Sequence, residues 1–240
     1  MKILISGSNG LLGQKLVKQL SERNIEFLAT SKGDNRNPDC PITCYQSIDI
    51  TDKNQVKDVV KSFMPDFIIH TAAITNVDYC ELNPELCHKV NVLGTQNIFE
   101  VAKNINAHFQ LLSTDFVFDG KKSTPYNTFD KRNPLNIYGK TKAKGELAVE
   151  EILHPKGQGT ILRTSWLISP VRKNFLLTIL KLIREKKQIE VVSDQIGCPT
   201  STYTLAEVVL KIITDNVENG KKLEPYLHCC DDGQTNWYEI

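Results

Sequence analysis

Short apolar runs alternate along this chain with longer stretches in which apolar residues recur every three or four positions. The runs predict buried strands over residues 2–6, 25–30, 67–70, 108–112 and 161–163. The periodic stretches predict helices over residues 53–64, 85–104 and 138–153, and a first helix that carries Leu12, Leu16 and Leu20. Apolar strands that alternate with helices are typical of an α/β fold, a doubly wound parallel sheet covered on both faces and joined by right-handed crossovers.

The pattern loosens after residue 165, where we expect a helix over residues 174–186, a strand over 189–192, a helix over 205–216 and a strand over 226–229. No Gly/Ser-rich linker or repeat marks a boundary. We therefore expect a first domain over residues 1–165 and a small lobe over residues 166–240 that is interleaved with the last elements of the sheet. Because the final residues, Trp-Tyr-Glu-Ile, look like the opening of a helix, we expect this lobe to be incomplete at its C-terminal end.

Composition excludes several classes of partner. The 240 residues carry 29 Lys and Arg against 28 Asp and Glu, a net charge of +1. Such a balance provides no field that attracts a nucleic-acid polymer or a membrane surface. The longest apolar runs fall far short of the ~20 residues that cross a bilayer, and the N-terminus lacks the pattern of a signal peptide. We expect a cytoplasmic protein.

The seven cysteines form no Cys-x-x-Cys pair, and the five histidines show no spacing typical of metal ligands. We interpret the cysteines as reduced thiols and expect no metal site in this chain.

A glycine-rich turn joins the first strand to the first helix. Gly7, Gly10 and Gly13 are spaced as G-x-x-G-x-x-G. Glycines at these positions let the backbone approach a pyrophosphate closely, and the N-terminus of the helix offers free N–H groups and partial positive charge. The plain alternative is a tight turn without a ligand. The context of strand, turn and helix favours a dinucleotide-binding site of the Rossmann type.

The end of the second strand bears on which dinucleotide binds. NAD sites usually place a carboxylate there for the ribose hydroxyls, whereas this strand ends Thr30-Ser31-Lys32. Lys32 and Arg36 could hold a 2′-phosphate through charge-assisted hydrogen bonds. We therefore expect NADPH rather than NADH, with NADH as the alternative. Asp49 and Ile50, just before the next helix, are candidates for the edge of the adenine.

Tyr138 and Lys142 stand four residues apart at the start of a predicted helix, so their side chains share one face. A neighbouring ammonium is expected to stabilise a phenolate and to lower the pKa of the tyrosine from about 10. Upstream, the strand that ends at Ser113 and Thr114 places hydroxyls where ligands bind in open α/β sheets.

These three features occur in the order found in the extended short-chain dehydrogenase/reductases, which the chain resembles. Within them it resembles the dTDP-4-dehydrorhamnose reductases from Gly7 to the end of the chain. The segments that carry this resemblance are residues 113–120, 133–142 with Gly145 and Glu146, 163–166, and 194–200. The resemblance implies reduction of the C4 ketone of dTDP-4-dehydro-L-rhamnose, with Tyr138 as proton donor, Lys142 as its electrostatic partner and ribose ligand, and Thr114 as the hydroxyl that completes the set.

Motifs and resemblance together give the expected site. The residues expected to bind the cofactor are Gly7, Asn9, Gly10, Leu11, Leu12, Gly13, Ser31, Lys32, Asp49, Ile50, Ala72, Ala73, Ile74, Thr75, Leu112, Tyr138 and Lys142. Those expected to bind the nucleotide-sugar substrate are Thr75, Val77, Thr114, Asp115 and Trp166. Since residues 167–173 lack the glycine common there in the family, the fit of that segment to the substrate's pyrophosphate stays open.

Two other functions and two properties stay open at this stage. One alternative is another nucleotide-sugar enzyme of the same family, a 4-epimerase or 4,6-dehydratase. The other is a non-catalytic regulatory subunit that resembles the β subunit of methionine adenosyltransferase. Some members of the family bind Mg²⁺ between subunits, so a Mg²⁺ requirement and a homodimer are both left undecided.

Overall fold

A parallel sheet of seven strands forms the centre of the protein, in the order β10-β6-β5-β4-β1-β2-β3. The computed structural model describes residues 1–153, 158–185, 188–220, 222 and 224–240. The strands of this sheet are β1 Lys2–Ser6, β2 Glu26–Ser31, β3 Tyr45–Ser47, β4 Phe67–His70, β5 His108–Thr114, β6 Gly159–Thr164 and β10 Tyr226–Cys229. All six neighbouring pairs are parallel, which confirms the predicted doubly wound α/β fold.

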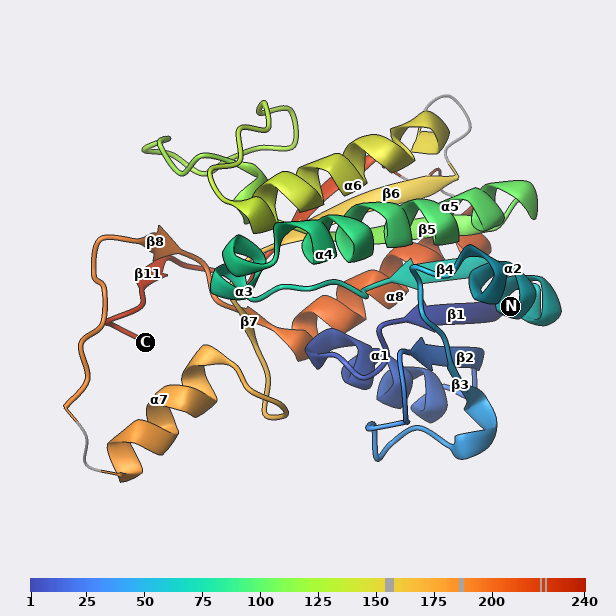
Figure 1. Ribbon diagram of the computed structural model, residues 1–240, viewed down its shortest axis with the longest axis horizontal. Coiled ribbons are helices and arrows are strands. Elements are labelled where there is room, and N and C mark those ends of the chain that lie inside the picture. Colours follow the sequence, from blue (N-terminus) through green and yellow to red (C-terminus); the bar gives the residue numbers. More distant parts are fainter. Residues whose placement is uncertain (154–157, 186–187, 221, 223) are drawn as a thin grey trace.

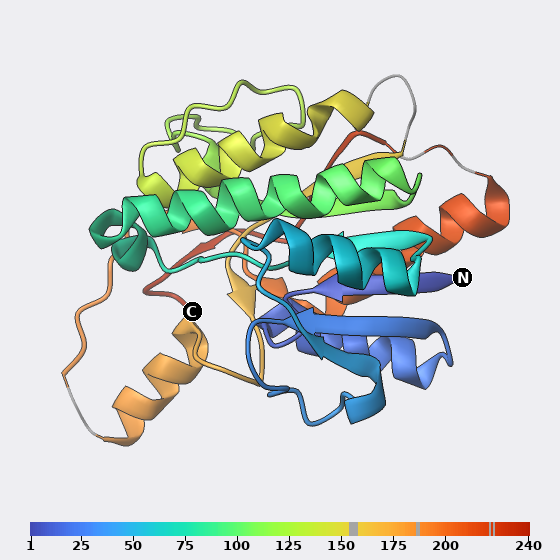
Figure 2. The same cartoon turned by 45° about the vertical axis from the view of Figure 1, so that its right-hand side comes forward.

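Helices cover both faces of the sheet, as Figures 1 and 2 show. α1 Leu11–Glu22 and α8 Thr202–Asn219 pack on one face, and α2 Lys53–Phe63, α5 Thr95–Asn104 and α6 Ile137–Leu153 pack on the other. The other helices of the described chain are α3 Val77–Leu82, α4 Pro84–His88 and α7 Phe175–Arg184. Successive side chains of β1 point to opposite faces of the sheet. Ile3 and Ile5 pack with the apolar stripes of α1 and α8, whereas Leu4 packs with those of α2, α5 and α6.

The helix expected over residues 85–104 is a continuous helical run with an interruption. It comprises α4, a π-helical segment η2 (Lys89–Gly94) and α5. Inside η2, the Asn91 side chain bonds the backbone of Ile74 on both sides, accepting from its N–H at 2.8 Å and donating to its carbonyl at 2.9 Å. Such π-helical turns are frequent at functional sites, and this one holds the segment after β4 against the helix.

In the C-terminal third, the structure differs from the predicted elements at one strand and leaves the end of one helix untested. Residues 189–192 form no strand, because within the described chain they have no neighbouring strand to pair with. The helix expected over residues 174–186 is α7, and its last expected residue, Lys186, lies outside the described residues.

The region after residue 165 contributes to two structures. α8 packs on α1, and β10 pairs with β6 at the edge of the main sheet. The rest forms a lobe of α7 and two small sheets, in which β7 Leu167–Ile168 pairs with β9 Thr200–Ser201 and β8 Ile196–Gly197 pairs with β11 Thr235–Asn236. Figures 1 and 2 show α7, β8 and β11 beyond the carboxyl ends of the central strands. Among the described helices, none has the length and apolar character to span a membrane.

Candidate active site

The glycine turn after β1 is built by close backbone packing. Gly7 has a φ of +88°, and a Cβ on it would lie 2.6 Å from the backbone nitrogen of Ala72. A Cβ on Gly13 would lie 2.2 Å from the carbonyl oxygen of Gly7. α1 begins after Gly10 without a side-chain cap, so its first N–H groups are available to an anion. The turn therefore has the form that a pyrophosphate requires.

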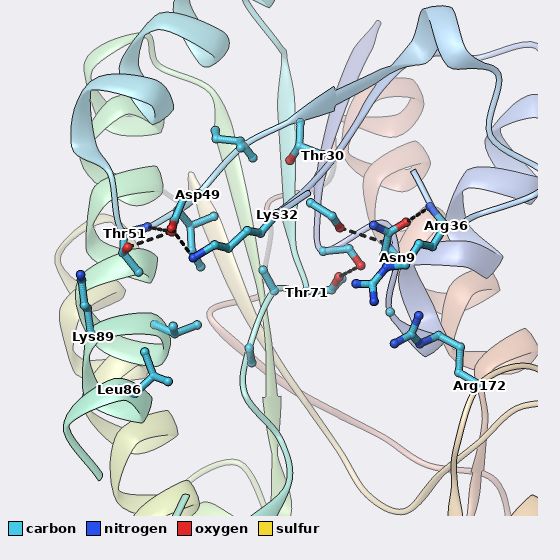
Figure 3. A pocket seen from close by; sticks show the side chains of 18 residues that line it. Asn9, Thr30, Lys32, Arg36, Asp49, Thr51, Thr71, Leu86, Lys89 and Arg172 are labelled. Atoms are coloured by element: carbon cyan, nitrogen blue, oxygen red, sulfur yellow. Dashed lines mark hydrogen bonds and ion pairs between the residues drawn. The ribbon is translucent and has the colours of Figure 1, made fainter. Parts of the chain in front are cut away.

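A cavity of about 350 Å³ opens beside this turn (Figure 3). We call it the basic cavity, because Lys32, Arg36, Lys89 and Arg172 all line it. Among the described residues that line it, the one carboxylate is that of Asp49, which lies 2.7 Å from the Lys32 ammonium.

Asp49 is held as a carboxylate. Burial acts to raise its pKa, but hydrogen bonds from Lys32 and from the N–H and hydroxyl of Thr51 outweigh that effect and lower the pKa to about 2. Lys32, which the end of β2 suggested for a 2′-phosphate, is therefore paired with Asp49 on the far side of the cavity from Asn9 (Figure 3).

A second cavity of about 410 Å³, which we call the tyrosine cavity, lies on the other side of the turn. Gly10, Thr71 and Ala73 line both cavities. An elongated ligand of two halves can therefore lie across the turn with one half in each cavity.

Tyr138 enters the tyrosine cavity from the first turn of α6. Asn136 accepts a hydrogen bond from the Gly139 N–H at 2.8 Å. A Cβ on Gly139 would lie 2.2 Å from the carbonyl oxygen of Phe116, so the glycine lets α6 start directly against the segment that follows β5. This contact places Tyr138 beside Thr114, the last residue of β5.

The Tyr138 phenol is neutral. Burial raises its pKa, a hydrogen bond with Thr114 acts to lower it, and the nearby Asp115 raises it further. This direction is opposite to the one that the spacing to Lys142 predicts, because desolvation of a phenol that is 8% exposed outweighs other effects. A neutral phenol at physiological pH is the form that a proton donor needs.

Lys142, one turn further along α6, donates from Nζ to the carbonyl oxygen of Leu112 at 2.7 Å. Burial lowers its pKa to about 8, while the carboxylate of Glu146 acts to raise it. Glu146 is fully buried and is held by Ser113 Oγ at 2.5 Å and by Arg163 Nη2 at 2.8 Å. α6 is thus tied to the ends of β5 and β6 through a single carboxylate.

Asp115 lies at the mouth of the same cavity. Burial raises its pKa to about 6, against hydrogen bonds from Thr114 and from backbone N–H groups that lower it. Its oxygen Oδ1 lies 3.0 Å from the Thr114 hydroxyl, which links this carboxyl group to the tyrosine.

Trp166 forms the wall of the cavity on the side of the C-terminal lobe. Its φ of +44° is unusual for a bulky residue. The indole stacks on Trp237 with ring centroids 3.8 Å apart. A Cβ on Gly197 would lie 2.6 Å from the same indole, so a glycine there makes room for the ring.

The structure brings nearly all of the sequence-predicted site residues to these two cavities. The basic cavity is lined by Gly7, Asn9, Gly10, Ser31, Lys32, Asp49, Ile50, Ala72 and Ala73. The tyrosine cavity is lined by Gly10, Leu11, Leu12, Gly13, Ala73, Thr75, Val77, Leu112, Thr114, Asp115, Tyr138, Lys142 and Trp166. Ile74 lines neither and packs behind Tyr138 in a small apolar cluster.

Several residues of the site were missed from the sequence. Arg172 and Lys89 in the basic cavity, and Trp237 in the tyrosine cavity, were not among the residues that the motifs assigned to the site. The positioning role of Asn91 follows from two backbone hydrogen bonds that span 17 residues. An asparagine flanked by Val90 and Val92 was the one available signal.

These features fit a nicotinamide dinucleotide. The glycine turn leaves no room for side chains, the helix that follows has no side-chain cap, and the cavities adjoin at the turn. A metal site is not found among the described residues, because no group of three or more of their His, Cys, Asp or Glu side chains is arranged to bind an ion.

The family model, the sequence relatives and the solved structures that this chain matches all indicate the same family. Residues 1–240 match the family model described as the RmlD substrate binding domain. The chain is 35% identical over 240 residues to a dTDP-4-dehydrorhamnose reductase of Aggregatibacter actinomycetemcomitans, an alignment that covers 100% of this chain and 76% of the relative.

Solved structures agree. A dTDP-4-dehydrorhamnose reductase from Clostridium acetobutylicum is similar with a TM-score of 0.84 and 37% identity, over 100% of this chain and 77% of that one. The enzyme of the same name from Bacillus anthracis, solved in complex with NADP, is similar with a TM-score of 0.84 and 32% identity, over 99% and 77% of the two chains.

Proposed function

This chain belongs to the family described as the RmlD substrate binding domain, and from that premise we propose that it reduces the C4 ketone of dTDP-4-dehydro-L-rhamnose to dTDP-L-rhamnose with NADPH. The resemblance to this family that the motifs predicted is confirmed. The observation that carries the proposal is a neutral, buried Tyr138 in a cavity that adjoins a dinucleotide-type glycine turn.

Different parts of the site bind different parts of the cofactor. The turn of Gly7, Gly10 and Gly13 holds the pyrophosphate of the cofactor, and the basic cavity takes its adenosine half. Asp49, a carboxylate anchored by Thr51, accepts hydrogen bonds from that half. The bound cofactor supplies a hydride for the ketone carbon. We assign the cofactor chiefly to residues 1–165, which also supply Tyr138, Thr114 and Asp115 to the tyrosine cavity, and further contacts with the substrate to the lobe formed from residues 166–240.

Tyr138 donates its phenolic proton to the oxygen of the ketone as negative charge develops there. Thr114, which is hydrogen-bonded to the tyrosine, orients the phenol. The ammonium of Lys142 then lies one helical turn away to stabilise the phenolate that remains. General acid catalysis of this kind contributes about 10²- to 10⁴-fold.

Trp166 and Asp115 bound the space that the sugar would occupy. The flat indole, fixed by Trp237 and Gly197, offers an apolar surface for a deoxysugar, and the carboxyl group of Asp115 offers a hydrogen-bonding partner for its hydroxyls. Together these residues set the orientation in which the C4 oxygen meets Tyr138.

NADPH is proposed over NADH because the last residues of β2 carry no carboxylate and because Arg36, which follows β2, lines the basic cavity. The NADP complex of the Bacillus anthracis relative supports this preference.

The test is oxidation of NADPH and of NADH, followed by absorbance, with enzymatically prepared dTDP-4-dehydro-L-rhamnose, beside the Tyr138→Phe variant. Consumption by the wild-type protein, greatly reduced in the variant, is the expected result. An isomerised sugar without net oxidation would instead indicate an epimerase. Folded protein that binds NADPH and yet reduces nothing would overturn the proposal and favour a regulatory role.

A further inference from the structure

Arg172 has a backbone conformation that arginine rarely adopts. Its φ is +59°, in the left-handed region, which is unfavourable for a residue with a Cβ. The loop is held in place around it. Asn174 donates from Nδ2 to the carbonyl oxygens of Ser169 at 2.7 Å and of Arg172 at 3.1 Å. Strain that is retained in this way points to a function for the side chain.

The side chain of Arg172 lines the basic cavity, although its backbone belongs to the C-terminal lobe. Figure 3 shows its guanidinium reaching in from below Asn9 and near that of Arg36, on the side of the cavity away from Asp49. Arg36 is fixed here because its backbone N–H donates to Asn9 Oδ1 at 2.8 Å.

Two guanidinium groups therefore meet in one cavity, and no described residue that lines it supplies either of them with a carboxylate partner. The cavity's lining carboxylate, Asp49, is already paired with Lys32. Among the described residues, neither Arg36 nor Arg172 forms an ion pair with a carboxylate. Two planar donor groups that converge beside a glycine turn have the chemistry of a phosphate site.

We propose that Arg172 and Arg36 together bind one phosphate group of the dinucleotide cofactor. The lobe that receives the sugar thereby also holds the cofactor. This inference rests on the proposed use of a dinucleotide, and it does not depend on the identity of the sugar. The phosphate is either the 2′-phosphate of NADPH or the diphosphate bridge, and binding of NADPH and NADH distinguishes the two.

The experiment is equilibrium binding of NADPH and NADH to the whole chain, followed by fluorescence of the reduced nicotinamide, without any sugar nucleotide. Arg172→Gln removes the charge and shortens the side chain but leaves it polar. Lys173→Gln, in the same loop, removes the same charge from a residue that does not line the cavity. Arg172→Gly removes the charge and also relieves the left-handed backbone.

We expect Arg172→Gln and Arg172→Gly to weaken NADPH binding by about tenfold or more, and Lys173→Gln by less than about twofold. Arg172→Gly should melt no lower than the wild-type protein, because glycine tolerates a positive φ. Weaker binding in this variant therefore cannot be a consequence of misfolding.

Each outcome decides a point. A loss confined to NADPH supports the proposal and assigns the 2′-phosphate, whereas an equal loss for NADH supports it and assigns the diphosphate. Unchanged affinity for both cofactors overturns it, and if the KM for the sugar nucleotide then rises, Arg172 serves the substrate. A wild-type protein that binds neither dinucleotide would refute the proposed function itself.

Discussion

Replacing Glu146 by glutamine should destabilise the protein strongly, because this buried carboxylate neutralises a buried guanidinium. Oε1 accepts from Ser113 Oγ at 2.5 Å and from Arg163 Nε at 3.0 Å. Oε2 accepts from Arg163 Nη2 at 2.8 Å and from Arg132 Nη1 at 3.1 Å. A glutamine keeps one oxygen and turns an NH₂ group towards two donors, so two hydrogen bonds are lost.

The size of the destabilisation follows from the Arg163 guanidinium, which would remain buried without a carboxylate partner among the described residues. Arg163 is 4% exposed, and within the described residues Glu146 is the one carboxylate that pairs with it. Breaking a buried ion pair from one side costs about 3–5 kcal/mol. At roughly 2–4 °C per kcal/mol for a protein of this size, the melting temperature should fall by about 10 °C.

Glu150→Gln is the matched control, one turn further along α6. Its carboxylate binds Arg132 Nη2 at 2.6 Å and the Tyr226 hydroxyl at 2.5 Å, and its side chain is 30% exposed. Because water can solvate the Arg132 and Tyr226 groups that lose their partner, we expect the free energy of unfolding to fall by only about 1 kcal/mol. Urea unfolding of the three proteins measures the difference.

The Glu146→Gln substitution should also change the pH dependence of kcat, because it changes the pKa of Lys142. The Glu146 carboxylate raises the pKa of Lys142, which burial otherwise lowers, to its value of about 8. Without that carboxylate the ammonium loses its proton at lower pH, and the alkaline limb of the kcat profile should shift to lower pH. Equal stability losses in Glu146→Gln and Glu150→Gln, with an unmoved pH profile, would refute this reasoning.

Three further changes test other parts of the site. Tyr138→Phe should lower kcat by about 10²- to 10⁴-fold and leave the affinity for NADPH unchanged, since the ring still fills its buried place; equal losses in both would contradict the role of the hydroxyl. Burial, and secondarily Lys142, lowers the pKa of His70 from 6.5 to about 3, so the unfolded chain binds a proton that the folded one does not. Stability should therefore fall as the pH drops from about 6.5 towards 3, and urea unfolding of His70→Gln should show a shallower fall. Gly197→Ala places a methyl group against the Trp166 indole and should raise the KM for the sugar nucleotide at unchanged affinity for NADPH, whereas truncation of its exposed neighbour in Ile196→Ala should change neither.

The parts of the site that were predicted from the sequence are those set by local spacing. A glycine turn between a strand and a helix, and a tyrosine four residues before a lysine, have geometry that follows from a few adjacent residues. Their places at the carboxyl ends of neighbouring strands then follow from the parallel fold. In the structure these residues line the two cavities.

The features that were missed depend on contacts between distant segments. The pKa of Tyr138 moves in the opposite direction to the one expected, because burial beneath Thr114 and Asp115 is not visible in a spacing of four residues. Residues 189–192 have the composition of a strand, but no partner strand pairs with them in the described chain. Arg172 and Trp237 reach the cavities from the lobe across long sequence separations.

The central claim is that the protein transfers a hydride to C4 of the sugar while Tyr138 protonates the oxygen. The most direct measurement supplies NADPH that carries deuterium at the transferable position and analyses the dTDP-sugar product by mass spectrometry and NMR. We expect dTDP-L-rhamnose heavier by one deuterium at C4, formed by the wild-type protein and at least about 10²-fold more slowly by Tyr138→Phe. A product without deuterium at C4, or the same rate in both proteins, would contradict it.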